Sequence, residues 1–215
     1  MCTVSLEPTT YETPRTPEPA SQYLLWIDGV GGFLVCLSHR VTLGQANPEA
    51  VVDIPLLADV SRHHATLQRD TEGYFLEAIR KTQVNGQATD KVLLRSADRI
   101  TFGNSCQMQF WQPVPVSASA RLDLVSGHRF LHPVDAVLLM ADTLLIGPGP
   151  QAHVAMPDLT QPLVLYRQKA SLAVRWSGNL VINGQVHEGK GVLEAGATLE
   201  TEQLTLSLER ADRER

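Results

Sequence analysis

A short run of the sequence, Ser61-Arg62-His63-His64-Ala65, places a hydroxyl, a guanidinium and two imidazoles on consecutive residues. A serine hydroxyl and the backbone N–H groups of a tight loop can donate to phosphate oxygens. An arginine beside them adds charge-assisted hydrogen bonds worth about 1.5 to 3 kcal/mol each. Ser61 and Arg62 come just before residues 65–69, Ala-Thr-Leu-Gln-Arg, which we expect to form a strand. Ser61 and Arg62 thus stand where a loop with this chemistry would lead into a strand.

The other reactive residue types indicate neither a metal site nor an enzyme. Adjacent residues of a strand face opposite ways, so His63 and His64 cannot chelate one metal ion together. The remaining histidines lack ligand spacing, and the cysteines form no C-x-x-C pair: His39, His128, His132, His153 and His187; Cys2, Cys36 and Cys106. Gly147-Pro148-Gly149 follows an apolar run, but its prolines and the lack of a helical pattern after it exclude a nucleotide loop. We therefore expect no metal, no cofactor and no catalysis.

The composition narrows the class of partner. The 215 residues carry a formal net charge of −5, and the sequence pI of about 5.8 provides no basic footprint for nucleic acid or an anionic membrane. The sequence has no apolar stretch long enough to cross a bilayer, and its first residues lack the pattern of a signal peptide. We therefore expect a cytoplasmic protein that binds other proteins.

The elements that must position the Ser-Arg pair are short strands. Residues 1–21 hold Pro8, Pro14, Pro17 and Pro19 among Thr, Glu and Ser, which predicts a disordered tail. From Tyr23 onward, apolar runs of strand length alternate with turn residues, and the first two runs, 23–28 and 33–38, predict a hairpin. Neither half shows a helical period of useful length, so the sequence predicts an all-β protein built from antiparallel β-sandwiches.

The rhythm of strands restarts after a connector, and the two halves resemble each other. Thr42-Leu43-Gly44 matches Leu145-Ile146-Gly147 at an offset of 103 residues, and the Asn85-Gly86 turn matches Asn183-Gly184 at an offset of 98. A nearly constant offset predicts a tandem duplication. We accordingly expect domains at 22–112 and 119–210, a linker at 113–118, and charged residues at 211–215 as a second tail.

The order of motifs in the first half resembles the forkhead-associated (FHA) domain. The resemblance covers residues 22–112: Gly44 ends one strand, Ser61-Arg62-x-His64-Ala65 leads into another, and Asn85-Gly86 forms a turn before a final Ile-x-Phe-Gly stretch. It implies a sandwich that binds phosphothreonine peptides through the loops at one end. By the same resemblance His64 ties the binding loop together, and Gly44, Asn85 and Gly86 are structural. Residues 119–210 resemble a degenerate copy without the Ser-Arg pair or the histidine.

Two positions depart from the family's pattern. The arginine that follows the turn glycine in the family is Gln45 here, and the asparagine that holds the peptide backbone falls on Arg80. Both changes remove a contact to the ligand, whereas Arg80 and Lys81 bring two cations to the same loop. The resemblance thus implies phosphopeptide binding by Ser61, Arg62, Arg80, Lys81 and Gln45, weakened or altered in specificity.

Two functions stay open at this point. The first is a non-enzymatic phosphothreonine reader in a regulatory or signalling complex, and the second is a phosphate-independent scaffold or structural subunit. The tail adds a candidate partner within the chain, because Thr13-Pro14 and Thr16-Pro17 stand in an acidic, proline-rich stretch that a kinase could reach. Retention of Ser61, Arg62 and His64 favours the reader; Gln45 and Arg80 favour the scaffold.

Overall fold

The computed structural model of the protein describes residues 21–49, 51–114, 117–168 and 171–211, and these contain strands and no helix. The first half forms β1 (Gln22–Ile27), β2 (Gly31–Cys36), β3 (Arg40–Gln45), β4 (Ile54–Leu57), β5 (Ala65–Arg69), β6 (Tyr74–Ala78), β7 (Thr82–Val84), β8 (Gln87–Ala88), β9 (Lys91–Leu93), β10 (Arg99–Phe102) and β11 (Cys106–Trp111). The second half forms β12 (Ala120–Leu124), β13 (Arg129–Phe130), β14 (Ala136–Leu139), β15 (Thr143–Gly147), β16 (Val154–Ala155), β17 (Leu163–Gln168), β18 (Ser171–Ile182), β19 (Gln185–Leu193), β20 (Ala197–Glu200) and β21 (Thr205–Arg210). The prediction of an all-β fold is confirmed.

The expected tails lie almost wholly outside the described residues. Of residues 1–21 the structure describes Ser21 alone, and of 211–215 it describes Ala211 alone. Thr13 and Thr16 therefore lie outside the described residues. Within the part that the structure describes, no helix could cross a membrane.

The N-terminal sandwich is a six-stranded sheet packed on part of a fifteen-stranded one. The smaller sheet has the order β13-β4-β3-β5-β6-β9, and β3 pairs with β4 in parallel. Side chains along these strands alternate between the core and the surface. In β10 and β11 the fully buried side chains include Ile100, Phe102, Met108 and Phe110, and the residues between them are more exposed. Each such side chain contributes about 1.5 to 3 kcal/mol on burial. This core holds the strands whose loops form the candidate site.

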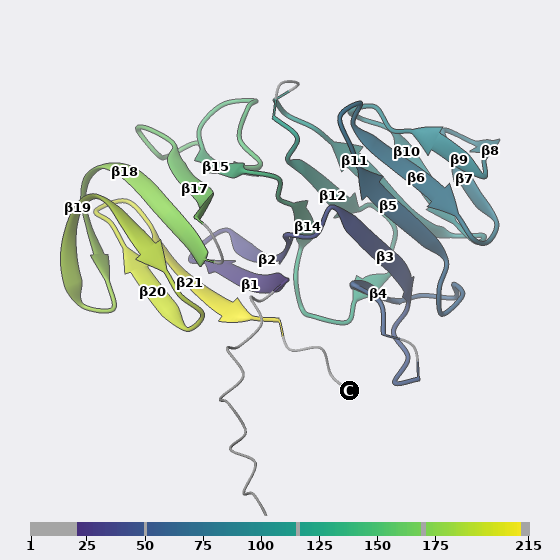
Figure 1. The fold of residues 1–215 in the computed structure, drawn as a ribbon, viewed down its shortest axis with the longest axis horizontal. Helices are drawn as coiled ribbons and strands as arrows, with labels where there is room; N and C mark the ends of the chain where they lie inside the picture. Colours follow the sequence, from purple (N-terminus) through teal and green to yellow (C-terminus); the bar gives the residue numbers. More distant parts are fainter. Residues whose placement is uncertain (1–20, 50, 115–116, 169–170, 212–215) are drawn as a thin grey trace, which may run out of the picture.

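At the centre of the long sheet, strands from one half of the sequence pair with strands from the other half. β1 pairs with β21, the last strand, while β11 pairs with β12, and β2 joins β14 in parallel. In Figure 1 the purple β1 and β2 accordingly lie beside the yellow β21. The first hairpin thus completes the sheet of the second half, and β12 and β14 extend that of the first. The boundaries 22–112 and 119–210 stay predictions, but these strands join the two stretches.

The central strands are buried on both faces, which explains their lack of polar alternation. Leu25 and Val35 face the core of the C-terminal sandwich, whereas Leu34 and Cys36 face that of the N-terminal sandwich. Two polar side chains mark the seam: the Arg167 guanidinium donates to the Leu37 carbonyl at 2.9 Å, and the Tyr74 hydroxyl donates to the Ala118 carbonyl at 2.8 Å. The two sandwiches therefore share one continuous set of strands.

The halves also match in local geometry. Asn85 and Asn183 both have positive φ, 52° and 51°, and their side-chain oxygens accept from the amides of Arg99 and Thr198. The apolar runs 172–176 and 179–182 belong to one long strand, β18, whose register with β19 shifts between Arg175 and Asn179. The tandem duplication itself stays a prediction.

Candidate functional site

Three loops meet at the Gln45 end of the N-terminal sandwich. The β3–β4 loop meets the β4–β5 loop where the backbone N–H of Gln45 donates to the backbone carbonyl of Ser61 at 3.0 Å. The β6–β7 loop is joined through Lys81, whose carbonyl accepts from the Gly103 amide at 2.9 Å, so the β10–β11 turn belongs to the same end. The structure thus brings the site residues predicted from the sequence to one end of the sandwich.

His64 connects two of these loops from a buried position. Its Nδ1 accepts from the Ser61 amide at 3.1 Å, and its Nε2 lies 3.0 Å from the Lys81 carbonyl. The two partners assign the proton to Nε2, because an amide can only donate and a carbonyl can only accept. Burial lowers the pKa of His64, the bond to the Lys81 carbonyl opposes this, and the nearby Arg80 charge lowers it further. The ring is therefore a neutral link that also packs edge-on to Phe102 at 5.6 Å.

Gly44 permits the close approach of β3 to the β4–β5 loop. A Cβ at this position would lie 1.8 Å from the carbonyl oxygen of Arg62, a backbone atom that has little freedom to move. In the second half, a Cβ on Gly147 would lie 2.8 Å from the Cα of Pro162. The glycine therefore sets the position of Ser61 and Arg62 relative to Gln45.

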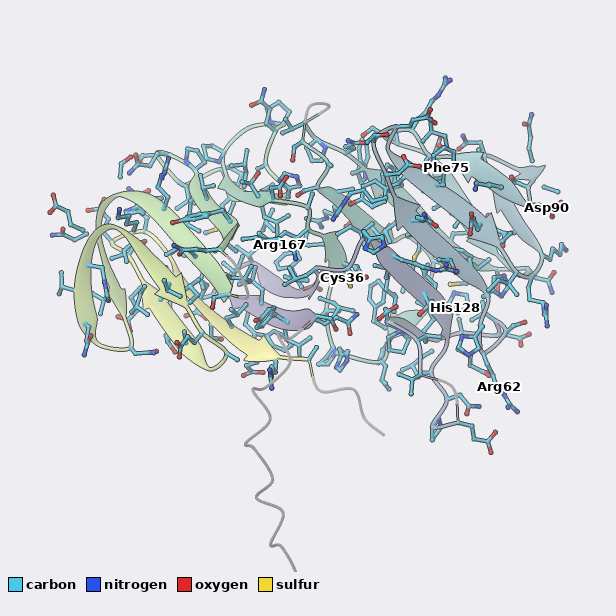
Figure 2. The ribbon with its side chains drawn as sticks, in the orientation of Figure 1. Cys36, Arg62, Phe75, Asp90, His128 and Arg167 are labelled. Carbon is cyan, nitrogen blue, oxygen red and sulfur yellow. The ribbon has the colours of Figure 1, made fainter. Side chains whose placement is uncertain are left out.

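The charged side chains stand at the rim of this end, and Figure 2 shows Arg62 at the outer edge of the molecule. Arg62 forms an ion pair with Glu49 of the β3–β4 loop, 3.1 Å between Nη1 and Oε2, and both side chains are mostly exposed. Exposed pairs of this kind contribute at most about 1 kcal/mol, so a ligand can replace the carboxylate. Gln45 and Ser61 are half-buried beneath them. The rim thus offers a guanidinium that already holds one anion.

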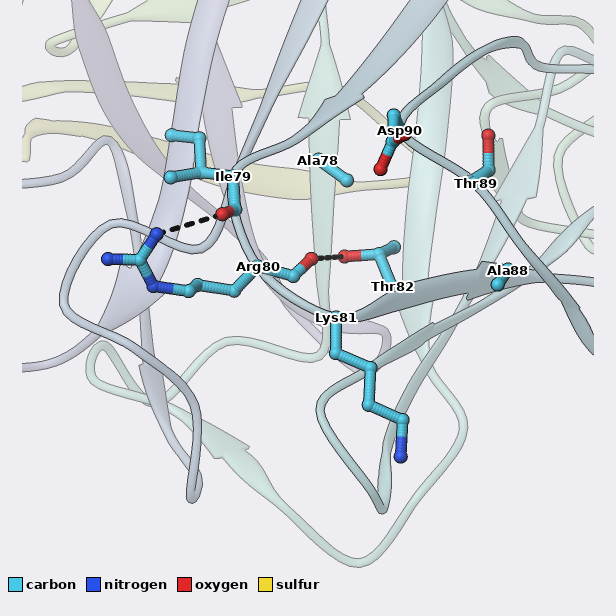
Figure 3. Close-up of a pocket in the computed structure, with 8 residues that line it drawn as sticks. All are labelled: Ala78, Ile79, Arg80, Lys81, Thr82, Ala88, Thr89 and Asp90. Atoms are coloured by element: carbon cyan, nitrogen blue, oxygen red, sulfur yellow. Dashed lines mark hydrogen bonds between the residues drawn. The ribbon is translucent and has the colours of Figure 1, made fainter.

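Arg80 and Lys81 add two exposed cations from the β6–β7 loop. The Arg80 guanidinium donates to the Ile79 carbonyl at 2.9 Å (Figure 3). Lys81 Nζ donates to Asn104 Oδ1 at 3.1 Å. The Thr82 hydroxyl donates to the Arg80 carbonyl at 2.8 Å and fixes the turn of the backbone. Among the residues that the structure describes, both cations bond only to neutral oxygens, so their charge is available to an anion.

Glu49 and Asn104 belong to this end of the sandwich but were not predicted from the sequence. The predicted Asn85-Gly86 turn lies beside this end. Glu49 and Asn104 sit on loops far from Arg62 and Lys81 in the sequence, and no local pattern pairs them. The Asn85-Gly86 turn sits on the β7–β8 hairpin, where the Asn85 amide group donates to Asp98 at 2.8 Å. Asn85 and Gly86 thus shape the neighbouring hairpin.

A hollow of about 480 Å³ adjoins the β6–β7 loop, between that loop and the β8–β9 turn (Figure 3). It is lined by Ala78, Ile79, Arg80, Lys81, Thr82, Ala88, Thr89 and Asp90. Backbone bonds hold the two walls together, from the Ala78 amide to the Asp90 carbonyl at 2.8 Å and from the Thr89 amide to the Thr82 carbonyl at 3.2 Å. The cations and this hollow share one loop.

At the matching end of the second half, the hydrogen bonds between the described residues are made by neutral side chains. The Thr160 hydroxyl and Gln203 amide bond to each other, and the Gln161 side chain donates to the Ser177 carbonyl at 3.0 Å. Across the described ranges, no three His, Cys, Asp or Glu side chains gather closely enough to hold a metal ion. The arrangement best suited to an anionic ligand is therefore the end built by Ser61, Arg62, Arg80 and Lys81.

A family model matches the stretch of the chain that builds this end of the N-terminal sandwich. Residues 41–103 match the family model of the FHA domain. The chain is also similar to an NMR structure of the FHA-2 domain of an ABC transporter from Mycobacterium tuberculosis, at 26% identity over 51% of this chain and 82% of that chain, with a TM-score of 0.28. No curated protein matches the chain. The resemblance read from Ser61–Ala65 is confirmed over residues 41–103.

Proposed function

We propose that this chain, whose residues 41–103 match the family model of the FHA domain, reads threonine-phosphorylated proteins through the loops at the Gln45 end of its N-terminal sandwich. The observation that supports this most is the set of three rim cations, Arg62, Arg80 and Lys81, held around one buried histidine link. The proposed setting is a regulatory complex that acts after a Ser/Thr kinase. A cytoplasmic location stays part of the proposal.

The phosphate is expected to bind among Ser61, Arg62 and Arg80. Ser61 offers a hydroxyl, because its amide is already used by His64. Arg62 exchanges the Glu49 carboxylate for the phosphate, and Arg80 exchanges a neutral carbonyl for a charged acceptor. A dianionic phosphate attracts a guanidinium more strongly than a single carboxylate does, so both exchanges favour binding.

The affinity is expected to be low. Gln45 and Arg80 replace two ligand contacts, each worth about 1.5 to 3 kcal/mol, so a complex of micromolar strength, at about −8 kcal/mol, would weaken towards millimolar. Lys81 and Arg80 restore part of this through charge. We therefore propose a weak reader with altered specificity.

A second candidate function is a phosphate-independent scaffold. The observation that favours it is the shared set of central strands, since β1, β2 and β14 tie residues 41–103 to the second sandwich. The end of that sandwich that matches the Gln45 end is bonded through the neutral side chains of Thr160, Gln161 and Gln203. In that case the two sandwiches would present one rigid surface to a partner.

Binding of a phosphothreonine peptide pool distinguishes the two functions. The full chain is titrated with the pool and with the same pool after phosphatase treatment, and the titration is repeated with Ser61→Ala and Arg62→Ala. The reader requires binding that is lost on dephosphorylation and weakened in both variants. Binding that ignores the phosphate, or that is equal in Ser61→Ala, would remove the site assignment and favour the scaffold.

The chain's own N-terminus is a further proposed ligand. Gln22 Nε2 donates to the Asp53 carbonyl at 2.8 Å, so the first strand begins beside the end of the β3–β4 loop. Thr16 and Thr13 precede Ser21 by five and eight residues, which spans about 17 to 28 Å when extended. A tethered phosphothreonine would act at an effective concentration near millimolar, enough to offset a weak site.

Competition tests this self-binding. The full chain, phosphorylated at Thr13 or Thr16, should bind an outside phosphopeptide several-fold more weakly than the Thr13→Ala/Thr16→Ala variant treated with the same kinase. Equal affinity for the outside peptide would remove the tail as a ligand and leave the reader in place.

A further inference from the structure

The hollow beside the β6–β7 loop contains an acidic group without a partner. Within the part of the chain that the structure describes, the Asp90 carboxylate makes no hydrogen bond and no ion pair, and the side chain is exposed. Its neighbour Lys91 is engaged elsewhere, 2.8 Å from the Glu77 carboxylate. Asp90 thus presents an unneutralised negative charge at a hollow that shares a loop with the proposed phosphate site.

The cations of the same hollow point away from Asp90. Figure 3 shows the charged ends of Arg80 and Lys81 extending from the loop on the side opposite Thr89 and Asp90. Their bonds hold them there, to the Ile79 carbonyl and to Asn104. The loop therefore separates two charges: positive towards the rim and negative towards the hollow.

The walls of the hollow suit the stem of a long side chain. Ala78, Ala88 and the β-branched Thr82 and Thr89 leave open space between the two backbone segments, and Thr82 is itself buried with its hydroxyl occupied. Aliphatic stems of Lys and Arg cover such surface while the charged end reaches a carboxylate. The backbone bonds of Ala78 and Thr89 fix Asp90 relative to the loop.

We infer that this hollow selects a lysine or arginine of the phosphopeptide, held by Asp90 while the phosphate is held at the rim. This specificity rests on the proposed function, because it adds a second subsite to the same ligand. The favoured ligand is then a peptide that carries phosphothreonine and a nearby basic residue. The chain's own tail has this composition, since Arg15 is the one basic residue of 1–21 and stands between Thr13 and Thr16.

Selection from a degenerate phosphothreonine peptide library tests the subsite. The full chain should enrich Lys and Arg at one fixed position relative to the phosphothreonine, by about two- to fivefold over neutral residues, as expected for an exposed ion pair. Asp90→Asn should abolish that enrichment while phosphate dependence remains, and Asp90→Lys should shift the preference at the same position to Asp and Glu. Glu72→Gln, which removes an exposed charge from the β5–β6 turn, is the matched control and should leave the enrichment unchanged.

The outcomes separate the subsite from the reader. Phosphate-dependent binding without basic enrichment, or with enrichment that survives in Asp90→Asn, would overturn the subsite and leave the reader standing. Binding of library peptides regardless of phosphate would overturn both.

Discussion

Replacing His64 by alanine should loosen the β4–β5 and β6–β7 loops together. The ring is 3% exposed, so its loss removes a buried side chain, an edge contact to Phe102 and the acceptor for the Ser61 amide. The Lys81 carbonyl keeps the Gly103 amide as a donor. The free energy of unfolding should therefore fall by about 1 to 3 kcal/mol for the Ser61 amide that loses its acceptor, and further for the cavity that the ring leaves. Together these lower it by about 3 kcal/mol.

Thermal unfolding measures this cost. For a chain of this size about 3 kcal/mol lowers Tm by about 6 to 12 °C. The control is His63→Ala, because His63 is the exposed neighbour and makes no contact within the described residues that the fold requires. Phosphopeptide affinity should fall at least tenfold in His64→Ala and stay unchanged in His63→Ala. Equal Tm values for the two variants would refute the role of His64 as the link between the loops.

Three further predictions follow from the same contacts. Glu49→Gln should raise phosphopeptide affinity about two- to threefold by releasing Arg62, and an unchanged Kd by calorimetry would show that the carboxylate does not compete. Gly44→Ala should lower stability by about 1 to 3 kcal/mol through its clash with the Arg62 carbonyl, whereas Gly127→Ala, which has open space around it, should not; chemical denaturation compares them. Burial lowers the pKa of His64 and of His153 in the folded chain. As pH falls below about 6.5, the two histidines therefore bind protons in the unfolded chain before they do so in the folded chain, which favours unfolding. Tm should therefore decrease from pH 7.5 to pH 5.5, and a Tm that rises over this range would contradict the assignment of neutral rings.

The strands and turns were predictable because their signals are local. Alternation of apolar and polar residues marks β10 and β11, and the Asn-Gly pairs predict the turns at Asn85 and Asn183, where φ is positive. The pairing of the first hairpin was not predictable. Residues 23–27 and 33–36 are apolar on both faces, so their pattern fits either sandwich, and pairing with β21 rather than β11 depends on contacts far along the chain.

The candidate site divides in the same way. Ser61, Arg62 and His64 are found from a contiguous motif, and Gly44 from its place at the end of a strand. Glu49, Asn104 and Asp90 join the site or its hollow only because separate loops fold together, which no spacing in the sequence reports. The departures at Gln45 and Arg80 could be read directly, but the directions of the Arg80 and Lys81 side chains required the structure.

The most direct test of the reader is the footprint of a phosphothreonine peptide on the amide NMR spectrum of the full chain. Signals of residues 44–49, 59–64, 79–82 and 103–105 should shift with the phosphorylated peptide and stay in place with its dephosphorylated form. Shifts that are the same for both forms, or that fall on other strands and leave residues 59–64 and 79–82 unmoved, would contradict phosphate reading at this end of the sandwich.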